Sequence, residues 1–360
     1  MLKRNTIAAL VCLGLAPMAP AAEACTRALY VSDDGLVVTG RSMDWNDDMH
    51  SDIWLFPRGM ERDGAAGPQS IKWTSKYGSL IVAGYNAGTA DGINEKGLVA
   101  NVLYLAESDY GAPIPGKPTL SISAWAQYVL DNYGAVSEAV DALKADPFTV
   151  LAPPLPNGRG AQLHLILSDS TGDSAVFEYI DGKLVIHHSK DYRVVTNSPS
   201  YDQQLAIDAY WKRVGGMTFL PGTVNPADRF VRASFLVGQL PKAVDKRIIT
   251  ALPDQKFAFQ AVAGVLGVMR AVGVPLGYQG PADQPNVSST LWRTAYDQRD
   301  MIMYFDSATT PNTFWVPLSK MSFQNGAPIM KLPLAGGKVY SGDASPHFEK
   351  VDAPFKFLSP

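Results

Sequence analysis

The stretch AAEACTRAL, residues 21–29, places a cysteine directly after an Ala-x-Ala sequence. The residues before it are arranged like an export leader, with a basic start and an apolar run over residues 7–15 that is too short to cross a bilayer. Ala-Glu-Ala at 22–24 fits the small-x-small rule for peptidase cleavage. We therefore predict that residues 1–24 are a signal peptide and that Cys25 becomes the first residue of the mature chain.

A lipoprotein signal is the alternative for this cysteine, because lipidation also uses a cysteine just after the cut. Such a signal usually has Leu three residues before the cysteine and a small residue two residues before it. Ala22 and Glu23 occupy those places here. In this alternative the chain is an exported binding protein anchored at Cys25, and the mass of the mature protein distinguishes the two.

The cysteine count makes Cys25 chemically interesting. The chain has two cysteines, and Cys12 leaves with the predicted leader. A single cysteine in an oxidising compartment cannot form an internal disulfide, so it is either an inert small residue or a reactive thiol. At an N-terminus it carries its own base, since a free α-amine has a pKa of about 7.7 and a thiol about 8.5. The amine can take the thiol proton and return it to a leaving group.

Composition limits the partners of the protein. The chain of 360 residues has a net charge of only −3, which argues against nucleic acid and anionic membranes as partners. It is 46% hydrophobic, enough for a large core. The most apolar later segment, residues 257–272, contains Gln260 and Arg270 and predicts a buried core helix rather than a membrane span. Without a Pro- or Ser-rich linker, residues 25–360 are expected to form a single domain.

Strands and helices are predicted in blocks. Turn signals such as Asp33-Asp34-Gly35 and Asn94-Glu95-Lys96-Gly97 separate strand-like runs. The predicted strands are 26–31, 36–40, 80–84, 98–103, 163–168, 175–179, 184–187, 193–196, 290–296, 301–305 and 314–316. The predicted helices are 121–133, 136–144, 203–213, 227–238 and 257–272. This order favours an α+β fold with antiparallel sheets and helices packed outside.

GRSMDWNDD, residues 40–48, follows the second predicted strand. In a hairpin the end of the second strand returns beside the start of the first, so Arg41 and Asp44 are expected next to Cys25. The Asp could orient the α-ammonium and the Arg could lower the thiol pKa. A surface ion pair in an acidic loop is the alternative.

Several motifs in order along the chain resemble the choloylglycine hydrolase family, which includes bile salt hydrolases and penicillin V acylases. The motifs are CTRALY and GRSMDW near the mature start, DGINEKGLVANVLYL at 91–105, VVTNSPSYDQQL at 194–205, DRFVRASF at 228–235 and STLWRTAYDQRDMIMYF at 289–305. Each is weak alone, but together they cover nearly the whole mature chain. The resemblance implies an N-terminal nucleophile (Ntn) amidohydrolase with a four-layer αββα fold.

The resemblance also implies roles for individual residues. Cys25 corresponds to the nucleophile, and Arg41 and Asp44 to the pair that flanks it. Asn197 corresponds to the asparagine whose amide donates to the oxyanion, and the backbone N–H of Tyr104 completes that hole. Tyr104 stands where bile salt hydrolases tend to have Asn and penicillin V acylases Tyr.

For Arg229, Trp45 and Asn197 a purely structural role is the alternative. Arg229 corresponds to the family's arginine near the nucleophile, or is a solvated helix charge. Arg232, one helical turn on, is expected to face elsewhere. Met43 and Trp45 are predicted to bind substrate, with stacking by the Trp on an aromatic or acyl part; for Trp45 core packing is the alternative. Asn197 can also serve as a turn residue before Pro199.

The predicted function is periplasmic hydrolysis of a C–N amide bond through a cysteine thioester. The export leader and the short stretch between TNSPS and DRFVR resemble the Gram-negative branch of the family. Penicillin V is the first expected substrate, N-acyl homoserine lactones (quorum quenching) the second and conjugated bile salts the third. The family's habit suggests a homotetramer. No cofactor or metal is expected, because the histidines lack ligand spacing; they are His50, His164, His187, His188 and His347.

Overall fold

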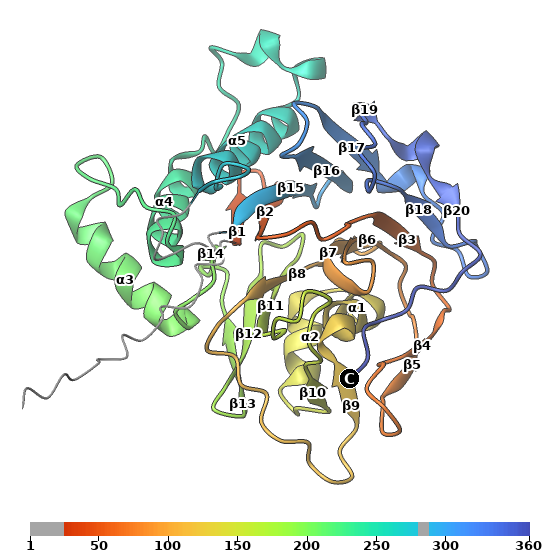
Figure 1. Ribbon diagram of the computed structural model, residues 1–360. Helices are drawn as coiled ribbons and strands as arrows, with labels where there is room; N and C mark the ends of the chain where they lie inside the picture. The colour runs from red at the N-terminus through yellow and green to blue at the C-terminus, as the bar shows by residue number, and fades with distance from the viewer. Residues whose placement is uncertain (1–24, 280–287) are drawn as a thin grey trace, which may run out of the picture.

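The computed structural model describes residues 25–279 and 288–360, so the predicted signal peptide lies outside the described residues. Two large sheets form the centre (Figure 1). In spatial order the first has β14 (Val194–Val195), β1 (Thr26–Val31), β2 (Val37–Trp45), β15 (Ser289–Asp297), β16 (Ile302–Ser307), β17 (Thr313–Pro317) and β19 (Gly342–Asp343). The second has β13 (Lys183–His188), β12 (Ser174–Ile180), β11 (Leu163–Ser168), β8 (Val99–Tyr104), β7 (Gly88–Asn94), β6 (Ser79–Gly84), β3 (Ile53–Phe56), β18 (Met330–Leu332) and β20 (Glu349–Lys350).

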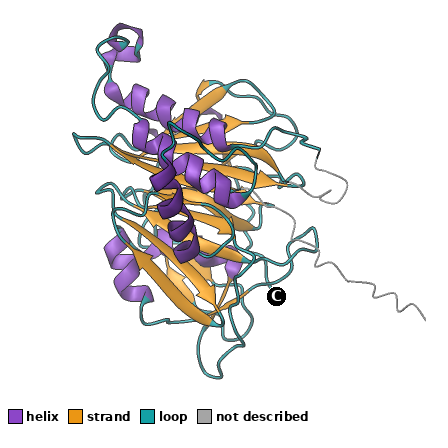
Figure 2. Ribbon diagram, turned by 90° about the vertical axis from the view of Figure 1, so that its left-hand side faces the viewer, coloured by secondary structure: helices purple, strands orange, loops and turns teal. Residues whose placement is uncertain are grey.

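Helices cover the outer faces of both sheets. The helices α3 (Tyr201–Val214), α4 (Pro226–Gln239) and α5 (Phe257–Val272) lie on the side of the first sheet, where α5 packs on β1, β2 and β15. The helices α1 (Ile122–Asn132) and α2 (Val136–Leu143) pack on the second sheet. Two short pairs complete the strands: β4 (Glu61–Asp63) with β5 (Lys72–Thr74), and β9 (Thr119–Ser121) with β10 (Thr149–Leu151). The order helix, sheet, sheet, helix is visible in Figure 2, and the predicted αββα fold is confirmed.

Most neighbouring strands run antiparallel, as the block pattern predicts. β17 and β19 are a parallel exception in the first sheet. The predicted boundaries of β1, β11 and α5 match those in the structure, and Ser121 caps α1 by accepting from the N–H of Ser123. Among the described residues, no helix combines the length and the apolar character needed to span a bilayer.

The boundary predicted for the second strand is wrong. The sequence suggested that the strand stops at Gly40 and that Arg41 and Asp44 lie in a loop, but β2 continues to Trp45 and all nine of its residues are buried. Pairing with β15 carries the strand on, with Arg41 opposite Thr294 and Asp44 opposite Thr290. Charged residues look like surface in a sequence, whereas here they lie between two strands and among other buried charges. The alternative of a surface ion pair therefore fails.

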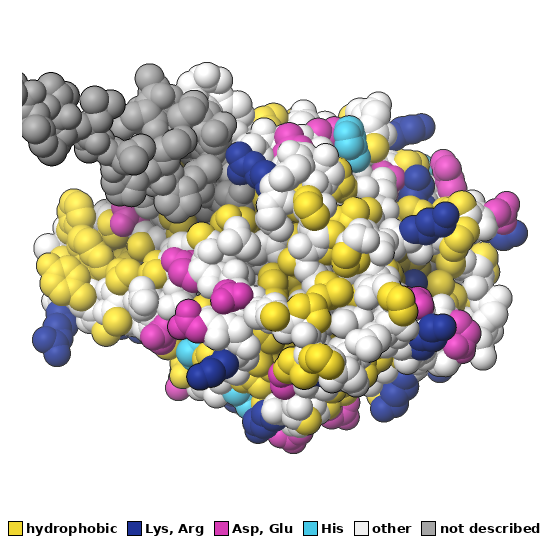
Figure 3. All heavy atoms as spheres, turned by 60° about the horizontal axis from the view of Figure 1, so that its bottom comes forward, with side chains coloured by type: hydrophobic (Ala, Val, Ile, Leu, Met, Phe, Trp, Pro, Cys, Tyr) yellow, Lys and Arg dark blue, Asp and Glu magenta, His cyan; other side chains and the backbone are white. Residues whose placement is uncertain are grey.

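On the face shown in Figure 3, basic and acidic side chains are interspersed, and no large patch carries charge of one sign. Apolar side chains gather on the side of that face where α3 lies in Figure 1. Three of the most exposed apolar residues belong to α3 and the loop after it: Tyr210 (64% exposed), Met217 (88%) and Phe219 (57%). Such a patch favours contact with another protein surface.

Candidate active site

The β1–β2 hairpin positions Cys25. Thr26, the first residue of β1, pairs with Ser42, which places Cys25 beside Met43. Its Sγ lies 3.9 Å from Met43 Sδ and 3.6 Å from the carbonyl oxygen of Asp44. Cys25 is only 2% exposed, yet it lines a cavity. The thiol therefore faces a space that a small molecule can occupy.

Arg41 brings a positive charge to the thiol. Its Nη2 lies 3.9 Å from Cys25 Sγ and donates to the carbonyl of Val102 at 3.1 Å. The guanidinium sits 4.6 Å from the centre of the Trp292 ring, a cation–π geometry. Nε and Nη1 of this buried side chain have no hydrogen-bond partner among residues 25–279 and 288–360. A buried charge with few partners acts strongly on its neighbours, here on the thiol.

Asp44 lies on the opposite face of β2 from Arg41, Met43 and Trp45, since side chains alternate along a strand. Its contact with Cys25 runs through its backbone carbonyl. Burial raises the pKa of its carboxyl, and the charges of Arg229 and Arg41 oppose that rise. Within the described part of the chain its buried Oδ1 accepts no hydrogen bond.

The surroundings of the thiol act on its pKa in both directions. Burial raises the pKa of Cys25, and the negative charge of Asp44 adds to the rise. Arg41 and, more weakly, Arg229 lower the pKa. A positively charged α-amine on the same residue would lower it further, because an opposite charge favours the thiolate.

Arg229, on α4, holds the start of the mature chain in place. Its Nη1 donates to the carbonyl oxygen of Cys25 at 2.7 Å and to Thr26 Oγ1 at 2.6 Å. Its Nη2 donates to Asn197 Oδ1 at 2.8 Å. Burial lowers the pKa of the guanidinium to about 10, while Asp44 raises it. The alternative of a solvated helix charge is excluded, since Arg229 is fully buried.

Asn197 follows β14 and is joined to Cys25 through Arg229. Because Arg229 occupies its Oδ1, its Nδ2 points the other way and donates to the carbonyl of Tyr104 at 2.8 Å. An amide nitrogen carries two N–H groups, so a second donor remains for another acceptor.

Arg232 lies on α4, one turn after Arg229. It donates to the carbonyl oxygens of Pro221 and Thr223 and faces away from Cys25, as predicted.

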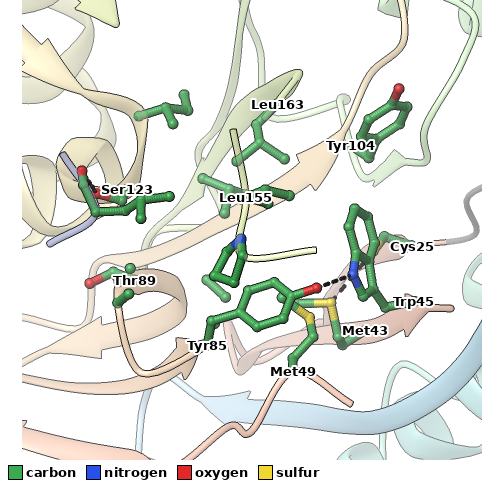
Figure 4. Close-up of a pocket in the computed structure, with 18 of the residues that line it drawn as sticks. Cys25, Met43, Trp45, Met49, Tyr85, Thr89, Tyr104, Ser123, Leu155 and Leu163 are labelled. Carbon is green, nitrogen blue, oxygen red and sulfur yellow. Dashed lines mark hydrogen bonds between the residues drawn. The ribbon is translucent and has the colours of Figure 1, made fainter. Parts of the chain in front are cut away.

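The cavity runs from Cys25 between the two sheets (Figure 4). Its volume is about 70 Å³, and its wall is largely carbon. Trp45 donates its Nε1 to the hydroxyl of Tyr85 at 2.7 Å, which fixes the indole in the wall. The predicted substrate residues Met43 and Trp45 and the predicted Tyr104 all lie on this wall.

Much of the cavity wall was not predicted. The residues missed include Met49, Tyr85, Thr89, Ile122, Ser123, Leu155, Pro156, Leu163 and Leu358. They come from loops and turns, two strands, a helix start and the C-terminal stretch, and none has a local signal that marks it as a binding residue. The Pro-rich loop at 153–156 was the one visible hint, because loops over a rigid scaffold often carry binding residues.

No group of three His, Cys, Asp or Glu side chains in the described residues is placed to hold a metal ion. The thiol of Cys25 and the guanidinium of Arg41 line the cavity. Behind the thiol, Arg229 joins the carbonyl oxygen of Cys25 to the side-chain amide of Asn197. Two facing sheets with such a cysteine at the start of an inner strand define an Ntn-type cysteine hydrolase of amide bonds.

Comparison with known proteins agrees. A model of the linear amide C–N hydrolases, choloylglycine hydrolase family, matches residues 25–330, and the chain belongs to this family. A penicillin V acylase of Pectobacterium atrosepticum is 46% identical over 374 residues, covering 98% of this chain and 97% of that protein. A bile salt hydrolase/transferase of Clostridium perfringens is 30% identical over 239 residues, covering 59% of this chain and 71% of that protein.

Solved structures give the same picture. The penicillin V acylase of Agrobacterium tumefaciens superposes with a TM-score of 0.84 and 48% identity, covering 93% of this chain and all of that one. A conjugated bile acid hydrolase variant from Clostridium perfringens superposes with a TM-score of 0.71, covering 88% of this chain and 99% of the other. At 22% identity the second shows the fold alone. The chain is thus a linear amide C–N hydrolase.

Proposed function

We propose that removal of residues 1–24 frees the α-amine of Cys25 and thereby activates the thiol. The amine takes the thiol proton, and the sulfur attacks the amide carbonyl of the substrate. The C–N bond then breaks, the leaving amine receives the proton, and a thioester remains. Water hydrolyses the thioester and restores the thiol. The observation that carries this proposal is the position of Cys25 Sγ on the cavity wall, 3.9 Å from Arg41 Nη2.

The oxyanion formed in this step needs hydrogen-bond donors. The second N–H of Asn197 and the backbone N–H of Tyr104 are the proposed pair. Arg229 supports this role because it holds Asn197 Oδ1 and the carbonyl of Cys25 with one guanidinium. Nucleophile and oxyanion donor are thus fixed relative to each other, as electrostatic preorganisation requires.

The apolar cavity is proposed to take the acyl part of the substrate. Trp45 and Tyr104, with ring centres 6.2 Å apart, suit an aryl or alkyl group. Penicillin V comes first, because two relatives that cover nearly the whole chain are penicillin V acylases. N-acyl homoserine lactones come second, and the quorum-quenching role rests on them. Conjugated bile salts come third, since a rigid steroid fits a cavity walled by Trp45 and Tyr104 less readily.

The lipoprotein alternative is disfavoured by the burial of Cys25. A diacylglyceryl group on Sγ would have to leave through the cavity, although Cys25 is 2% exposed and its carbonyl is held by Arg229. Mass spectrometry and N-terminal sequencing of the protein recovered from periplasmic extract test both leader and anchor. An unmodified N-terminal Cys25 supports the enzyme, and added diacylglyceryl mass supports the anchor.

The test of the activity is a side-by-side assay on penicillin V, a long-chain acyl homoserine lactone and glycocholate. We expect wild type to release amine most rapidly from penicillin V. Correctly processed Cys25→Ala should release none while keeping the wild-type melting temperature. Activity above background in Cys25→Ala would refute the nucleophile.

A homotetramer is proposed for the assembled protein. The exposed apolar patch of Tyr210, Met217 and Phe219 supports burial of this region against another copy. Light scattering of wild type and of Met217→Asp tests the assembly. A monomeric wild type would reject it.

A further inference from the structure

The C-terminal stretch returns to the cavity. After β20 the chain crosses the outer edge of the second sheet and ends near α1 and β9 (Figure 1). Phe355 anchors this path, since it is buried and its ring packs edge-on against Trp54 at 5.0 Å and Phe56 at 5.4 Å. The stretch is thus a packed part of the molecule.

Both backbone polar groups of Leu358, its N–H and its carbonyl, form hydrogen bonds. Its N–H donates to the carbonyl of Ala87 at 2.8 Å, in the turn between β6 and β7. Its carbonyl accepts from Ser121 Oγ at 2.6 Å and from Ser123 Oγ at 3.0 Å, at the start of α1. Three hydrogen bonds hold the backbone while the side chain lines the cavity.

Leu358 lies at the end of the cavity that is remote from the thiol. Figure 4 shows Ser123 and Thr89 on the side away from Cys25, and Ser123 is bonded to Leu358. The hydroxyls at this end are already engaged, since Ser123 donates to Leu358 and Thr89 donates to Gln127 Oε1 at 2.8 Å. The end wall therefore presents carbon to whatever reaches it.

We propose that Leu358 is a specificity-determining residue that limits the length of the acyl group. An acyl chain whose carbonyl lies at Cys25 Sγ must run toward this wall, and its last carbons meet the Leu358 side chain. This inference rests on the proposed function, in which the cavity takes the acyl part. The family match ends at residue 330, so the wall is supplied by a part of the chain beyond it.

The expected size of the effect follows from apolar pockets in general. One methylene more or less in such a pocket changes kcat/KM by about 10-fold or more. Replacing the Leu358 side chain by that of Ala removes three carbons from the wall. Space for about two methylenes then opens, and the preferred chain should lengthen accordingly.

The experiment uses full-length processed enzyme and a series of amides of one amine, with linear acyl groups from acetyl to tetradecanoyl. Leu358→Ala should raise kcat/KM about 10-fold for the amides two carbons beyond the wild-type optimum. Leu358→Trp should lower it about 10-fold for the longest chains that wild type accepts. Both variants should change hydrolysis of the acetyl amide least, because its short acyl group does not reach the wall. Leu184→Ala is the matched control, since Leu184 is equally half-buried but lies on β13 away from the cavity.

The outcomes separate the inference from the function on which it rests. Opposite shifts of the length profile in the two variants, with an unchanged profile in Leu184→Ala, support it. An unchanged profile in both Leu358 variants overturns it. An equal loss on all amides, acetyl included, also overturns it, because it indicates a structural role. If wild type hydrolyses no amide of the series but does hydrolyse another class of substrate, the proposal that the cavity binds the acyl group fails instead.

Discussion

Asp44 and Glu178 are both buried carboxyls, yet their surroundings are opposite. Glu178 on β12 is 1% exposed and well bonded: His164 Nδ1 lies 3.0 Å from Oε1, and the N–H of Tyr201 is 3.1 Å from each oxygen. His187 Nε2 lies 3.6 Å from Oε2. Asp44 has an oxygen without a hydrogen bond from any described residue.

The two pKa values move in opposite directions. Burial raises the pKa of Glu178, but its hydrogen bonds with His164 and His187 outweigh burial and bring the value to about 2. Burial dominates for Asp44 and raises its pKa. A satisfied buried carboxylate stabilises a fold, whereas an unsatisfied one beside a nucleophile is placed for a partner that chemistry supplies. For Asp44 the sequence predicts the α-ammonium of Cys25 as that partner.

The strongest test of this difference between Asp44 and Glu178 is to remove the free α-amine of Cys25, the predicted partner of Asp44. A protein that keeps one residue before Cys25 has the thiol but an amide in place of the amine. We expect no hydrolysis, because the base is missing. Amine release from penicillin V measures it, with intact mass as the check on the N-terminus. Wild-type turnover by the extended protein would remove the amine from the mechanism and leave Asp44 without its proposed partner.

Asn197 is related to both carboxyls through other residues. Its Oδ1 accepts from Arg229, whose charge acts on Asp44, and Tyr201, four residues later in the chain, donates its N–H to Glu178. An oxyanion donor acts in the transition state, so Asn197→Ala should lower kcat by about 10²–10³, or roughly 2.7–4 kcal/mol, with KM little changed. Asn197→Asp should be at least as damaging. Kinetics and melting temperature are measured on the same preparations. A lower melting temperature with kcat within about threefold of wild type would show that Asn197 has a structural role like that of Glu178. A change of about threefold is far smaller than the loss of kcat expected for a missing oxyanion donor.

Asp44→Asn tests the unsatisfied carboxyl. Loss of the charge that orients the amine should lower kcat by about 10², the lower range for positioned acid–base groups. The melting temperature should stay level or rise, because the substitution removes a buried charge whose Oδ1 accepts no hydrogen bond from a described residue. A lower melting temperature together with normal kcat would show that Asp44, like Glu178, stabilises the fold and does not act in catalysis.

Glu178→Gln should give the reverse pattern. Its kcat should stay near wild type, and the loss of charged hydrogen bonds should cost about 2 kcal/mol, or roughly 5 °C at pH 7. The folded-state pKa of about 2 lies below the ordinary 4.5, so the stabilisation is complete above 4.5 and is lost as the pH falls toward 2. The gap in melting temperature between wild type and variant should therefore narrow over that range. A gap that widens on acidification would contradict the assignment.

The hairpin that carries Cys25 could be predicted from the sequence. The Asp33-Asp34-Gly35 turn, with Gly35 at a φ of 80°, brings β2 back beside β1 and so brings Arg41 to the thiol. Family motifs located Asn197 and Arg229, which the structure joins at 2.8 Å. The roles of these residues and the leader stay predictions.

Two kinds of feature could not be predicted. The length of β2 was missed because Arg41 and Asp44 are buried by pairing with a strand about 250 residues later in the chain, as the register shows. The cavity wall was missed because Leu358 meets Ser123 from the far end of the chain. Contacts of this sequence separation leave no periodic trace, so only the folded chain reveals them.

The way Arg229 holds Cys25 affects when the enzyme becomes active. The described contacts of Cys25 use its carbonyl oxygen, its sulfur and the pairing of the residue that follows, so they do not depend on what is attached to its backbone nitrogen. Under the proposed mechanism these contacts can form in the precursor, before the α-amine is free. Under the proposed mechanism a single peptide-bond cleavage then converts a finished protein into an enzyme, so the location of the signal peptidase decides where amide hydrolysis begins.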